Sequence, residues 1–366
     1  MASLVFAQEL VHYILSMHTE VSVIERYDRQ MRVKQIGAAG QAKISASTIL
    51  IVGCGALGTY AAEQLVRAGV GTLYLVDPDT VSETNLQRQS LFTEADATNE
   101  LFKVDAAAAK LRQINHNVTI DVFPVELRPE LLAQMQPLTL ALDCSDNFSV
   151  RDLLNRLALN QHFPFVFAAC AGVSGQLMLV DPTAGPCLEC AFPDITKLKE
   201  RDCDILGVAT PLIPLVSSIQ VSLALRYIVS GAGALDQLTT VSCWPPAQQN
   251  FKVKKRADCP VCQHKQVPIT LNDKTLLRRL CGSNAWSVYL PQTRSIAEVA
   301  ATLAAKHVAY RVTPSMITFK WHDAPASYFK TGKVQLYKLN EQQAQQHYRA
   351  LWQLLKVPRQ KEGQPQ

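Results

Sequence analysis

The chain has little excess of charge of either sign and lacks an uninterrupted apolar run that would favour a membrane span. Its 36 Lys and Arg residues face 31 Asp and Glu residues, so the formal net charge is only +5. This weak excess argues against a nucleic-acid partner. The apolar stretch Ile205–Val229 contains Pro211, Pro214, Gln220 and Arg226, which predicts a buried core helix and no membrane partner.

The pattern of an export signal is also missing. The apolar segment Met1–Leu15 has neither a basic start nor a clear cleavage site, so residues 1–24 favour an amphipathic docking helix over a signal peptide. We therefore expect a cytoplasmic protein. Its ten cysteines should then bind metal or remain free thiols, because disulfides are rare in that compartment.

The motif that is most informative joins a strand, a glycine turn and a helix. Residues 48–52 are apolar and mostly β-branched, Gly53, Gly55 and Gly58 follow as G-x-G-x-x-G, and a second apolar run ends at Asp77. This order is the dinucleotide fingerprint in its required setting. The glycines permit a tight turn and close approach of N–H groups to phosphate, and Asp77 can accept hydrogen bonds from ribose hydroxyls. A purely structural turn is the alternative.

Polar residues follow at the places where the strands of a doubly wound sheet would end. Asn85 and Arg88 come after the second strand, where ligands bind in such sheets. Asp146 follows a buried strand at residues 138–142. It can bind Mg²⁺ beside phosphates or cap the next helix, and its position alone leaves both open.

Two segments before the glycine motif have modest interpretations. Arg26 and Arg29 are spaced to share one helical face, and a solvated basic face explains that spacing. Residues 37–47 are expected to form a polar linker.

Two C-x-x-C pairs predict a structural zinc site, formed by Cys187, Cys190, Cys259 and Cys262. Four thiolates can hold Zn²⁺ tetrahedrally and leave no position open for a substrate. A pair of redox motifs is the alternative. Cys203 lies between the pairs among acidic neighbours, which disfavour the thiolate and so favour an inert residue over a reactive one.

From about residue 269 the pattern changes to that of a small α+β accessory module, residues 269–357, without a catalytic cluster. Strands are expected at residues 287–290, 309–313, 316–321 and 334–339. Ser295 and Glu298 form a capping box that opens one helix, and Asn340 caps another. Residues 358–366 are polar and expected to be disordered.

Together these segments resemble the ThiF/MoeB/HesA family, the bacterial relatives of ubiquitin-activating enzymes. The region after Cys262 also resembles the C-terminal part of ThiF-type proteins of Gram-positive bacteria, through residues 280–284 and 329–334. The resemblance implies an α/β fold with a Rossmann-like, mostly parallel sheet, flanking helices and a zinc knuckle, within an adenylation domain of residues 25–268. The motifs follow the family's order: Arg26-Tyr-Asp-Arg29-Gln30, Gly53–Gly58, Asp77-Pro-Asp79, Asn85–Gln89, Lys103-Val, Asp143–Asn147 and both C-x-x-C pairs.

The resemblance implies an activity and a set of residues for it. The family adenylates the C-terminal glycine of a small β-grasp sulfur carrier, here expected to be ThiS-like and to end in Gly-Gly, with ATP and Mg²⁺. A homodimer is implied because Arg29 would reach the partner's site, and a cysteine desulfurase is a further expected partner. Phe102 replaces the proline that commonly precedes the family lysine. The implied catalytic residues are Arg29, Asn85, Arg88, Lys103, Asp146 and Cys203; the implied nucleotide-binding residues are Gly53, Gly55, Ala56, Gly58, Asp77, Asp79, Asn85, Arg88, Gln89, Lys103, Asp146 and Asn147.

Three other functions remain open at this point. A MoaD-like carrier of molybdopterin synthesis would use nearly the same site. An NAD-dependent oxidoreductase would share the glycine motif but leaves Arg88, Lys103 and the cysteine pairs without a role. A non-catalytic scaffold would bind a β-grasp protein without turnover.

Overall fold

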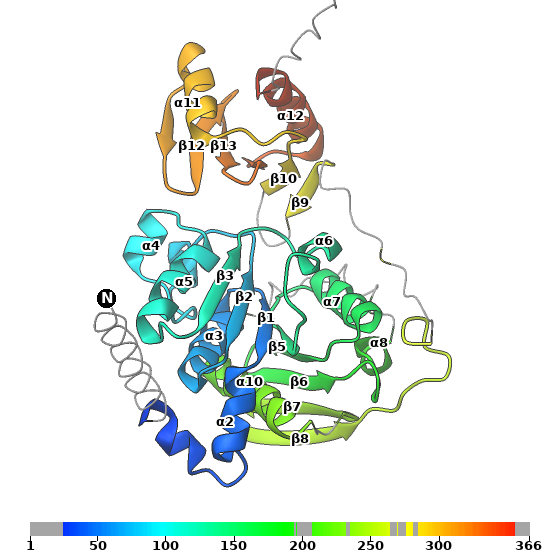
Figure 1. Ribbon diagram of the computed structural model, residues 1–366. Coiled ribbons are helices and arrows are strands. Elements are labelled where there is room, and N and C mark those ends of the chain that lie inside the picture. Colours follow the sequence, from blue (N-terminus) through cyan, green and yellow to red (C-terminus); the bar gives the residue numbers. More distant parts are fainter. Residues whose placement is uncertain are drawn as a thin grey trace, which may run out of the picture.

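The computed structural model describes residues 25–193, 195, 207–231, 235–263, 269, 276–280 and 285–355. The expected N-terminal helix, Cys203 and the expected disordered tail lie outside the described residues. Two sheets organise the chain, one of eight strands and one of six. Figure 1 shows the smaller sheet, with its two helices, as a module over the end of the larger sheet where β3 and α6 lie.

The larger sheet has the strand order β3-β2-β1-β4-β5-β6-β7-β8. The strands from β3 to β5 in this order pair in parallel, and those from β5 to β8 pair antiparallel. The expected Rossmann-like, mostly parallel sheet is therefore confirmed. Its strands are β1 (Thr48–Val52), β2 (Thr72–Val76), β3 (Thr119–Phe123), β4 (Leu140–Asp143), β5 (Phe165–Ala171), β6 (Ser174–Val180), β7 (Gln237–Cys243) and β8 (Pro246–Lys252).

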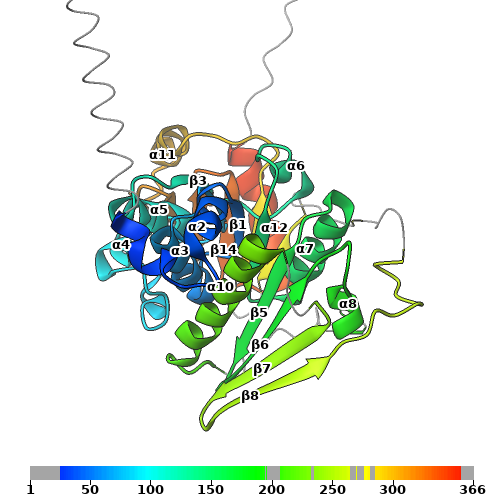
Figure 2. The ribbon, with the colours of Figure 1, turned by 60° about the horizontal axis from the view of Figure 1, so that its bottom comes forward.

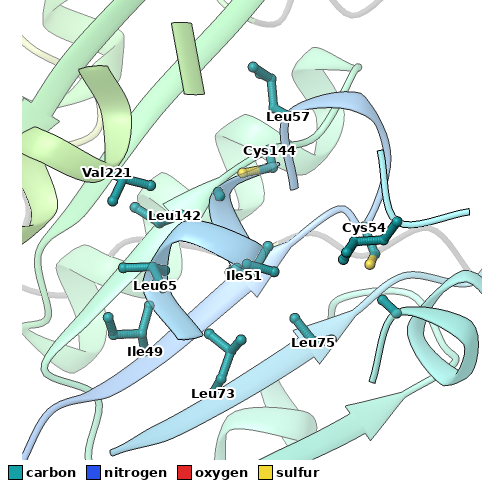
Figure 3. Close-up of a cluster of buried hydrophobic side chains, with 14 of the residues drawn as sticks. Ile49, Ile51, Cys54, Leu57, Leu65, Leu73, Leu75, Leu142, Cys144 and Val221 are labelled. Atoms are coloured by element: carbon teal, nitrogen blue, oxygen red, sulfur yellow. The ribbon is translucent and has the colours of Figure 1, made fainter. Parts of the chain in front are cut away.

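Helices cover both faces of this sheet, so all five residues of β1 are buried. Ile49 and Ile51 join a cluster with Leu65 of α3, whereas Leu50 and Val52 join another with α7 on the opposite face. Figure 3 shows the first cluster. The helices are α2 (Gly37–Ser45), α3 (Ala56–Ala68), η1 (Glu83–Asn85), α4 (Glu94–Thr98), α5 (Lys103–Ile114), α6 (Pro129–Leu132), α7 (Phe148–Gln161), α8 (Leu188–Ala191) and α10 (Leu212–Ser230).

The long apolar helix α10 is a core helix, as its interrupting polar residues predict. It is long and apolar enough to cross a membrane by length and composition alone. However, Val216, Gln220 and Ala224 are buried, and the helix lies across the sheet in Figure 2. The Gln220 amide donates to the carbonyl oxygens of Asp143 and Val166, at 2.9 Å each, which ties α10 to β4 and β5.

The expected polar linker at residues 37–47 is wrong, because most of it is helix α2. Gly40 lies against Val229 of α10, where even a Cβ atom would come within 3.0 Å of that side chain. Lys43 donates to the Val229 carbonyl at 2.6 Å. Small residues thus serve close helix–helix packing in this segment rather than flexibility.

The C-terminal module is an antiparallel sheet in the order β11-β12-β13-β14-β10-β9. The capping box at Ser295 and Glu298 is confirmed, and Asn340 accepts from the Gln343 N–H at 2.9 Å. The side chains of Met316 and Phe329 belong to the module but pack into the hydrophobic core of the larger sheet. Its elements are β9 (Arg278–Leu280), β10 (Ala285–Tyr289), α11 (Ile296–Ala305), β11 (Tyr310–Val312), β12 (Met316–Trp321), β13 (Ala324–Phe329), β14 (Lys333–Tyr337) and α12 (Glu341–Leu355).

Candidate functional site

The glycine turn joins β1 to α3 and needs glycine at two of its three positions. Gly53 has a φ of +93°, and a Cβ atom there would lie 2.6 Å from the Cys144 carbonyl oxygen. A Cβ atom on Gly58 would lie 2.0 Å from the Gly53 carbonyl oxygen. At Gly55 a Cβ atom would meet only Gln89, at 3.6 Å. This last position faces space that a phosphate can use, beside the N-terminus of α3, with Ala56 as its first residue.

Asp77 follows β2 and is buried beside the glycine turn. Its Oδ2 accepts from the Cys54 N–H at 2.7 Å, and its Oδ1 accepts from the Asp79 N–H at 2.8 Å. Burial raises the pKa of Asp77, whereas the nearby Lys103 ammonium lowers it. The carboxylate therefore fixes the turn and the start of the next loop, and only its remaining lone pairs can serve a ribose.

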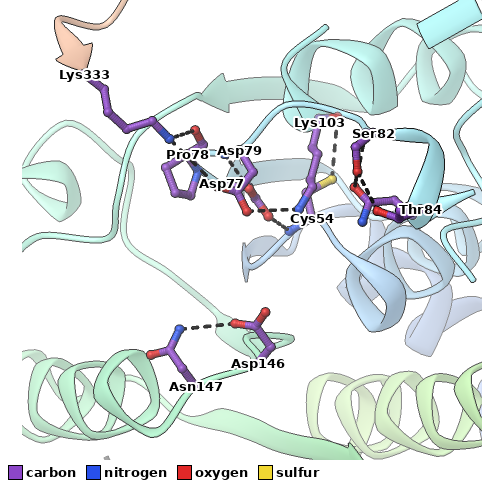
Figure 4. A network of polar contacts seen from close by, with 11 residues as sticks. Cys54, Asp77, Pro78, Asp79, Ser82, Thr84, Lys103, Asp146, Asn147 and Lys333 are labelled. Atoms are coloured by element: carbon purple, nitrogen blue, oxygen red, sulfur yellow. Dashed lines mark hydrogen bonds and ion pairs between the residues drawn. The ribbon is translucent and has the colours of Figure 1, made fainter. Parts of the chain in front are cut away.

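Lys103 opens α5 and forms the central ion pair of the site. Its Nζ lies 3.1 Å from Oδ2 of Asp79, and its side chain is 10% exposed whereas that of Asp79 is 54% exposed. Burial lowers the pKa of Lys103, but Asp77 and Asp79 more than offset this and hold it above its usual range. The lysine is therefore a cation at neutral pH, held at the carboxyl end of β2 (Figure 4).

The loop after Asp79 holds the side chains of Asn85 and Arg88 in local contacts. Asn85 Oδ1 accepts from the Ser82 hydroxyl at 3.0 Å, and an Arg88 guanidinium N–H donates to the Thr84 carbonyl at 3.0 Å. Gln89 is buried, and its Oε1 has no partner among the described residues. The Gln89 atom nearest the Cβ position of Gly55 is the amide nitrogen Nε2, at 3.6 Å, so a donor group lies beside the glycine turn.

Asp146 lies at the end of β4 across from Asp77 and Lys103 (Figure 4). The helix that follows is capped by Asn147, whose Oδ1 accepts from the Val150 N–H at 2.9 Å. Capping, one of the two roles left open for Asp146, therefore belongs to its neighbour. Asp146 is exposed and accepts from the Asn147 amide at 3.2 Å. An exposed carboxylate at this edge fits Mg²⁺, which takes few protein ligands and keeps several waters.

Arg29 is exposed on a helical segment at residues 25–31. Its neighbours anchor this segment: Tyr27 is buried, and the Gln30 amide donates to the Ala68 carbonyl at 3.0 Å. Ala68 ends α3, whose other end holds the glycine turn. The hydrogen bond from Gln30 to Ala68, next to Arg29, therefore lies at the end of α3 far from the glycine turn. At 1.5 Å per residue, about 18 Å of helix separates the two ends.

The four predicted metal ligands form one cluster, with all sulfur atoms within 4.8 Å of one another. The Sγ–Sγ distances include 3.9 Å for Cys187–Cys190, 3.7 Å for Cys187–Cys259 and 3.6 Å for Cys190–Cys262. A tetrahedral Zn²⁺ with Zn–S bonds of about 2.3 Å requires sulfur atoms about 3.8 Å apart. The donor set therefore fits zinc, and Cys187 and Cys259 are almost fully buried.

The thiols of the cluster differ in pKa: burial raises the pKa of Cys259, but backbone N–H groups of residues 261 and 262 more than offset this and lower it. Burial raises the pKa of Cys262 to about 12, and burial and the neighbouring thiols raise that of Cys187. Without a cation such thiols stay protonated, so metal binding must displace protons.

One residue of the site was not expected from the sequence. Lys333, at the start of β14, donates to the Pro78 carbonyl at 2.9 Å, and its Nζ lies 3.9 Å from Asp79 Oδ1. In the sequence, Lys333 belongs to residues 329–334, which were interpreted as part of an accessory module and as a resemblance to Gram-positive ThiF-type proteins, without a role at the site. Nothing local in the sequence signals a contact with residues 255 positions away.

A pocket of about 330 Å³ lies next to this group, at the carboxyl end of β3. Phe123, Pro124 and Val125 line one side, whereas Tyr289 and Thr331 of the C-terminal module line another. The pocket is thus shared between the two sheets, and Glu126, Arg128 and Gln134 add polar groups to the apolar lining on the β3 side.

A Rossmann-like sheet with a glycine turn, an acid after β2, a buried lysine and a four-cysteine cluster defines an adenylyltransferase-like enzyme related to ubiquitin-activating proteins. The chain belongs to the ThiF family, whose sequence profile matches residues 27–261. It is 31% identical over 322 residues to the sulfur carrier protein ThiS adenylyltransferase of Bacillus subtilis, which covers 86% of this chain and 95% of that protein.

Two further similarities extend this result. The chain is 32% identical over 266 residues to the adenylyltransferase and sulfurtransferase MOCS3 of Anopheles gambiae, covering 72% of this chain and 59% of that protein. The crystal structure of E. coli MccB with MccA-N7isoASN superposes with a TM-score of 0.58 at 18% identity, covering 66% of this chain and 75% of that one. The latter shows a shared fold.

Proposed function

We propose that the protein adenylates the C-terminal glycine carboxylate of a small β-grasp sulfur carrier of the ThiS kind, with ATP as donor and pyrophosphate as leaving group. The observation that supports this best is the Lys103–Asp79 pair beside the glycine turn, facing Asp146 across the same edge of the sheet. A buried cation, backbone N–H groups and an exposed carboxylate suit a magnesium-bound triphosphate. An NAD-dependent oxidoreductase has no use for this set, and family membership decides against it.

The strand order supports one orientation of the nucleotide along the edge of the sheet, from the phosphates near β1 to the base near β3. The glycine turn follows β1, Asp77 follows β2, and the pocket lies after β3; these strands are neighbours in the order β3-β2-β1. Phosphates at the turn and a ribose near Asp77 therefore direct the base toward the pocket.

The chemistry requires alignment and positive charge rather than a base. A terminal carboxylate has a pKa of about 3.3–3.7 and is ionised at neutral pH. Its oxygen forms a bond to the α-phosphorus while the bond to the β-phosphate oxygen breaks, and the electron pair leaves with pyrophosphate. Lys103 and Arg88 would offset the charge of two approaching anions, and Asn85 would donate to a phosphate oxygen. Asp146 would hold the Mg²⁺, which supplies further positive charge there.

Arg29 is proposed to complete the site of a second subunit. The anchor at Ala68 places it at the far end of α3 from its own glycine turn. Because an arginine side chain cannot span the length of this helix, roughly 18 Å, a role at phosphate requires a partner's site. The protein is therefore proposed to act as a homodimer.

The carrier is proposed to be ThiS-like because of the length of the similarity to the B. subtilis enzyme. An alignment over 86% of this chain necessarily extends into the C-terminal module. A MoaD-like carrier is the second candidate, because nearly the same activating site would serve it. The four-cysteine cluster is proposed to bind structural Zn²⁺, and a cysteine desulfurase is the expected source of sulfur downstream of adenylation.

ATP–pyrophosphate exchange tests this proposal. Purified protein with Mg²⁺ should exchange labelled pyrophosphate into ATP only when a ThiS-like carrier with its terminal glycine is present, and a carrier lacking that glycine is the matched control. Faster exchange with a MoaD-like carrier would change the pathway. Nucleotide binding without exchange for either carrier would favour a non-catalytic scaffold.

A further inference from the structure

Lys333 is a buried lysine that the proposed adenylation does not yet use: burial lowers its pKa, and Asp79 and Glu126 offset this in part. Its side chain is only 4% exposed, yet it comes from the C-terminal module and ends at the nucleotide site (Figure 4). Its ammonium donates to the Pro78 carbonyl at 2.9 Å and lies 3.9 Å from Asp79. A buried lysine is retained only where its charge is compensated.

Asp79 lies between two lysines that approach it from different parts of the chain. Lys103 contacts one carboxylate oxygen at 3.1 Å, and Lys333 lies nearest the other. Burial raises the pKa of Asp79, but both lysines more than offset this and hold it below its usual range. Asp79 itself is the half-exposed member of the group, so its charge faces the space where the nucleotide is proposed to bind.

A second contact ties the module to the residue before Lys103. The Phe102 N–H donates to the Ser315 hydroxyl at 3.0 Å, and the Phe102 ring lies 6.2 Å from that of Phe329. The module therefore contacts both loops that form the Lys103–Asp79 pair: one through Lys333, the other through Ser315.

We propose that Lys333 is a positioning residue of the nucleotide site, supplied by the C-terminal module. When Lys103 turns from Asp79 to the triphosphate, Asp79 would be left as an uncompensated anion facing a polyanion. Lys333 keeps that carboxylate paired and in place, so Lys103 can move without a penalty in repulsion. The inference rests on the proposed function, because it requires a nucleotide phosphate near Lys103.

Direct binding of a nucleotide analogue tests this without a carrier. Affinity for α,β-methylene-ATP with Mg²⁺ should be measured by calorimetry for Lys333→Met, which removes the ammonium, and Lys333→Gln, which keeps a donor for Pro78. Both should bind about tenfold more weakly than wild type. Lys320→Met is the matched control, because Lys320 lies on strand β12 of the same module and is exposed. It should bind within about twofold of wild type.

Rescue separates the electrostatic role from a structural one. In the double variant Asp79→Asn with Lys333→Met no carboxylate remains to be compensated, so most of the lost affinity should return; a variant that merely loosens the module would not recover. Wild-type affinity in both Lys333 variants, or a double variant as weak as Lys333→Met, would overturn the inference. Failure of the proposed function would instead appear as absent nucleotide binding in the wild type.

Discussion

Removal of one thiolate from the cysteine cluster should release the metal that connects the α8 segment to the segment after β8. Cys187 is the N-cap of α8 and Cys190 lies within that helix, whereas Cys259 and Cys262 follow β8. Cys259→Ser leaves the three thiols of Cys187, Cys190 and Cys262 without the fourth ligand of the tetrahedron. We expect the variant to lose its metal and its thermal stability together, because a structural zinc supplies folding energy.

The magnitude follows from the loop that the cluster closes. About 70 residues separate Cys190 from Cys259, and a cross-link over a loop of that length restricts the unfolded chain by roughly 4 kcal/mol at 25 °C. A change of this size lowers the melting temperature of a domain of about 240 residues by about 10 °C.

Metal content and melting temperature should be measured on the same preparations. Cys259→Ser is expected to contain little zinc and to melt about 10 °C below wild type, whereas Cys243→Ser, a free thiol of β7 outside the cluster, should retain both properties. One zinc per chain in Cys259→Ser would refute the assigned ligand. Loss of zinc with an unchanged melting temperature would refute the claim that the metal stabilises the fold by connecting the two segments.

Three further outcomes are expected. Lys103→Met should lower the rate of carrier-dependent pyrophosphate exchange about 100-fold or more, because a preorganised cation is lost. The circular dichroism spectrum should be unchanged, and a smaller decrease in rate would contradict a role of Lys103 at the phosphates. Equal amounts of Arg29→Ala and Asp146→Ala protein, mixed until subunits exchange, should regain about a quarter of wild-type activity, since half of the dimers carry one whole site; no recovery after verified exchange would place Arg29 outside the partner's site. Burial raises the pKa of Asp96, but hydrogen bonds, chiefly from Lys110, hold this pKa below its usual range. The ionised Asp96 carboxylate therefore stabilises the folded state at pH values above the unfolded-state pKa of about 3.9, and this stabilisation is lost as the pH falls. When the pH is lowered from about 6 to about 3, the free energy of unfolding measured by urea titration should therefore fall less for Asp96→Asn than for wild type. Equal decreases would contradict the lowered pKa of Asp96.

The features that could be predicted from the sequence are those encoded within short segments. The glycine turn depends on Gly53 and Gly58, whose neighbours leave no room for a Cβ atom, and the G-x-G-x-x-G spacing records that requirement. Each C-x-x-C pair is likewise local, and four thiolates admit few arrangements other than a tetrahedron. Strand β12 (Met316–Trp321) was predicted with its observed bounds, because apolar residues and a preceding turn delimit it.

The elements that were missed lack such local signals. Helix α2 has no side-chain cap and consists largely of glycine and alanine, so it depends on packing against α10. Strand β8 is exposed along its whole length and polar in its middle, which gives no alternation to detect. Strand β13 contains Pro325, a residue that disfavours a strand prediction.

The departure of this chain from its family's pattern at Phe102 has a physical explanation in the C-terminal module. A proline at this position would have no N–H, yet the Phe102 N–H donates to Ser315 of the module at 3.0 Å. The Phe102 ring is fully buried and lies near Phe329, which a proline could not match in contact area. The φ of Phe102, −58°, is one that proline also adopts, so the backbone path into α5 can stay the same while the side chain changes. The Phe102 N–H and the Phe102 ring are therefore the groups through which the second sheet holds the residue before Lys103 in place.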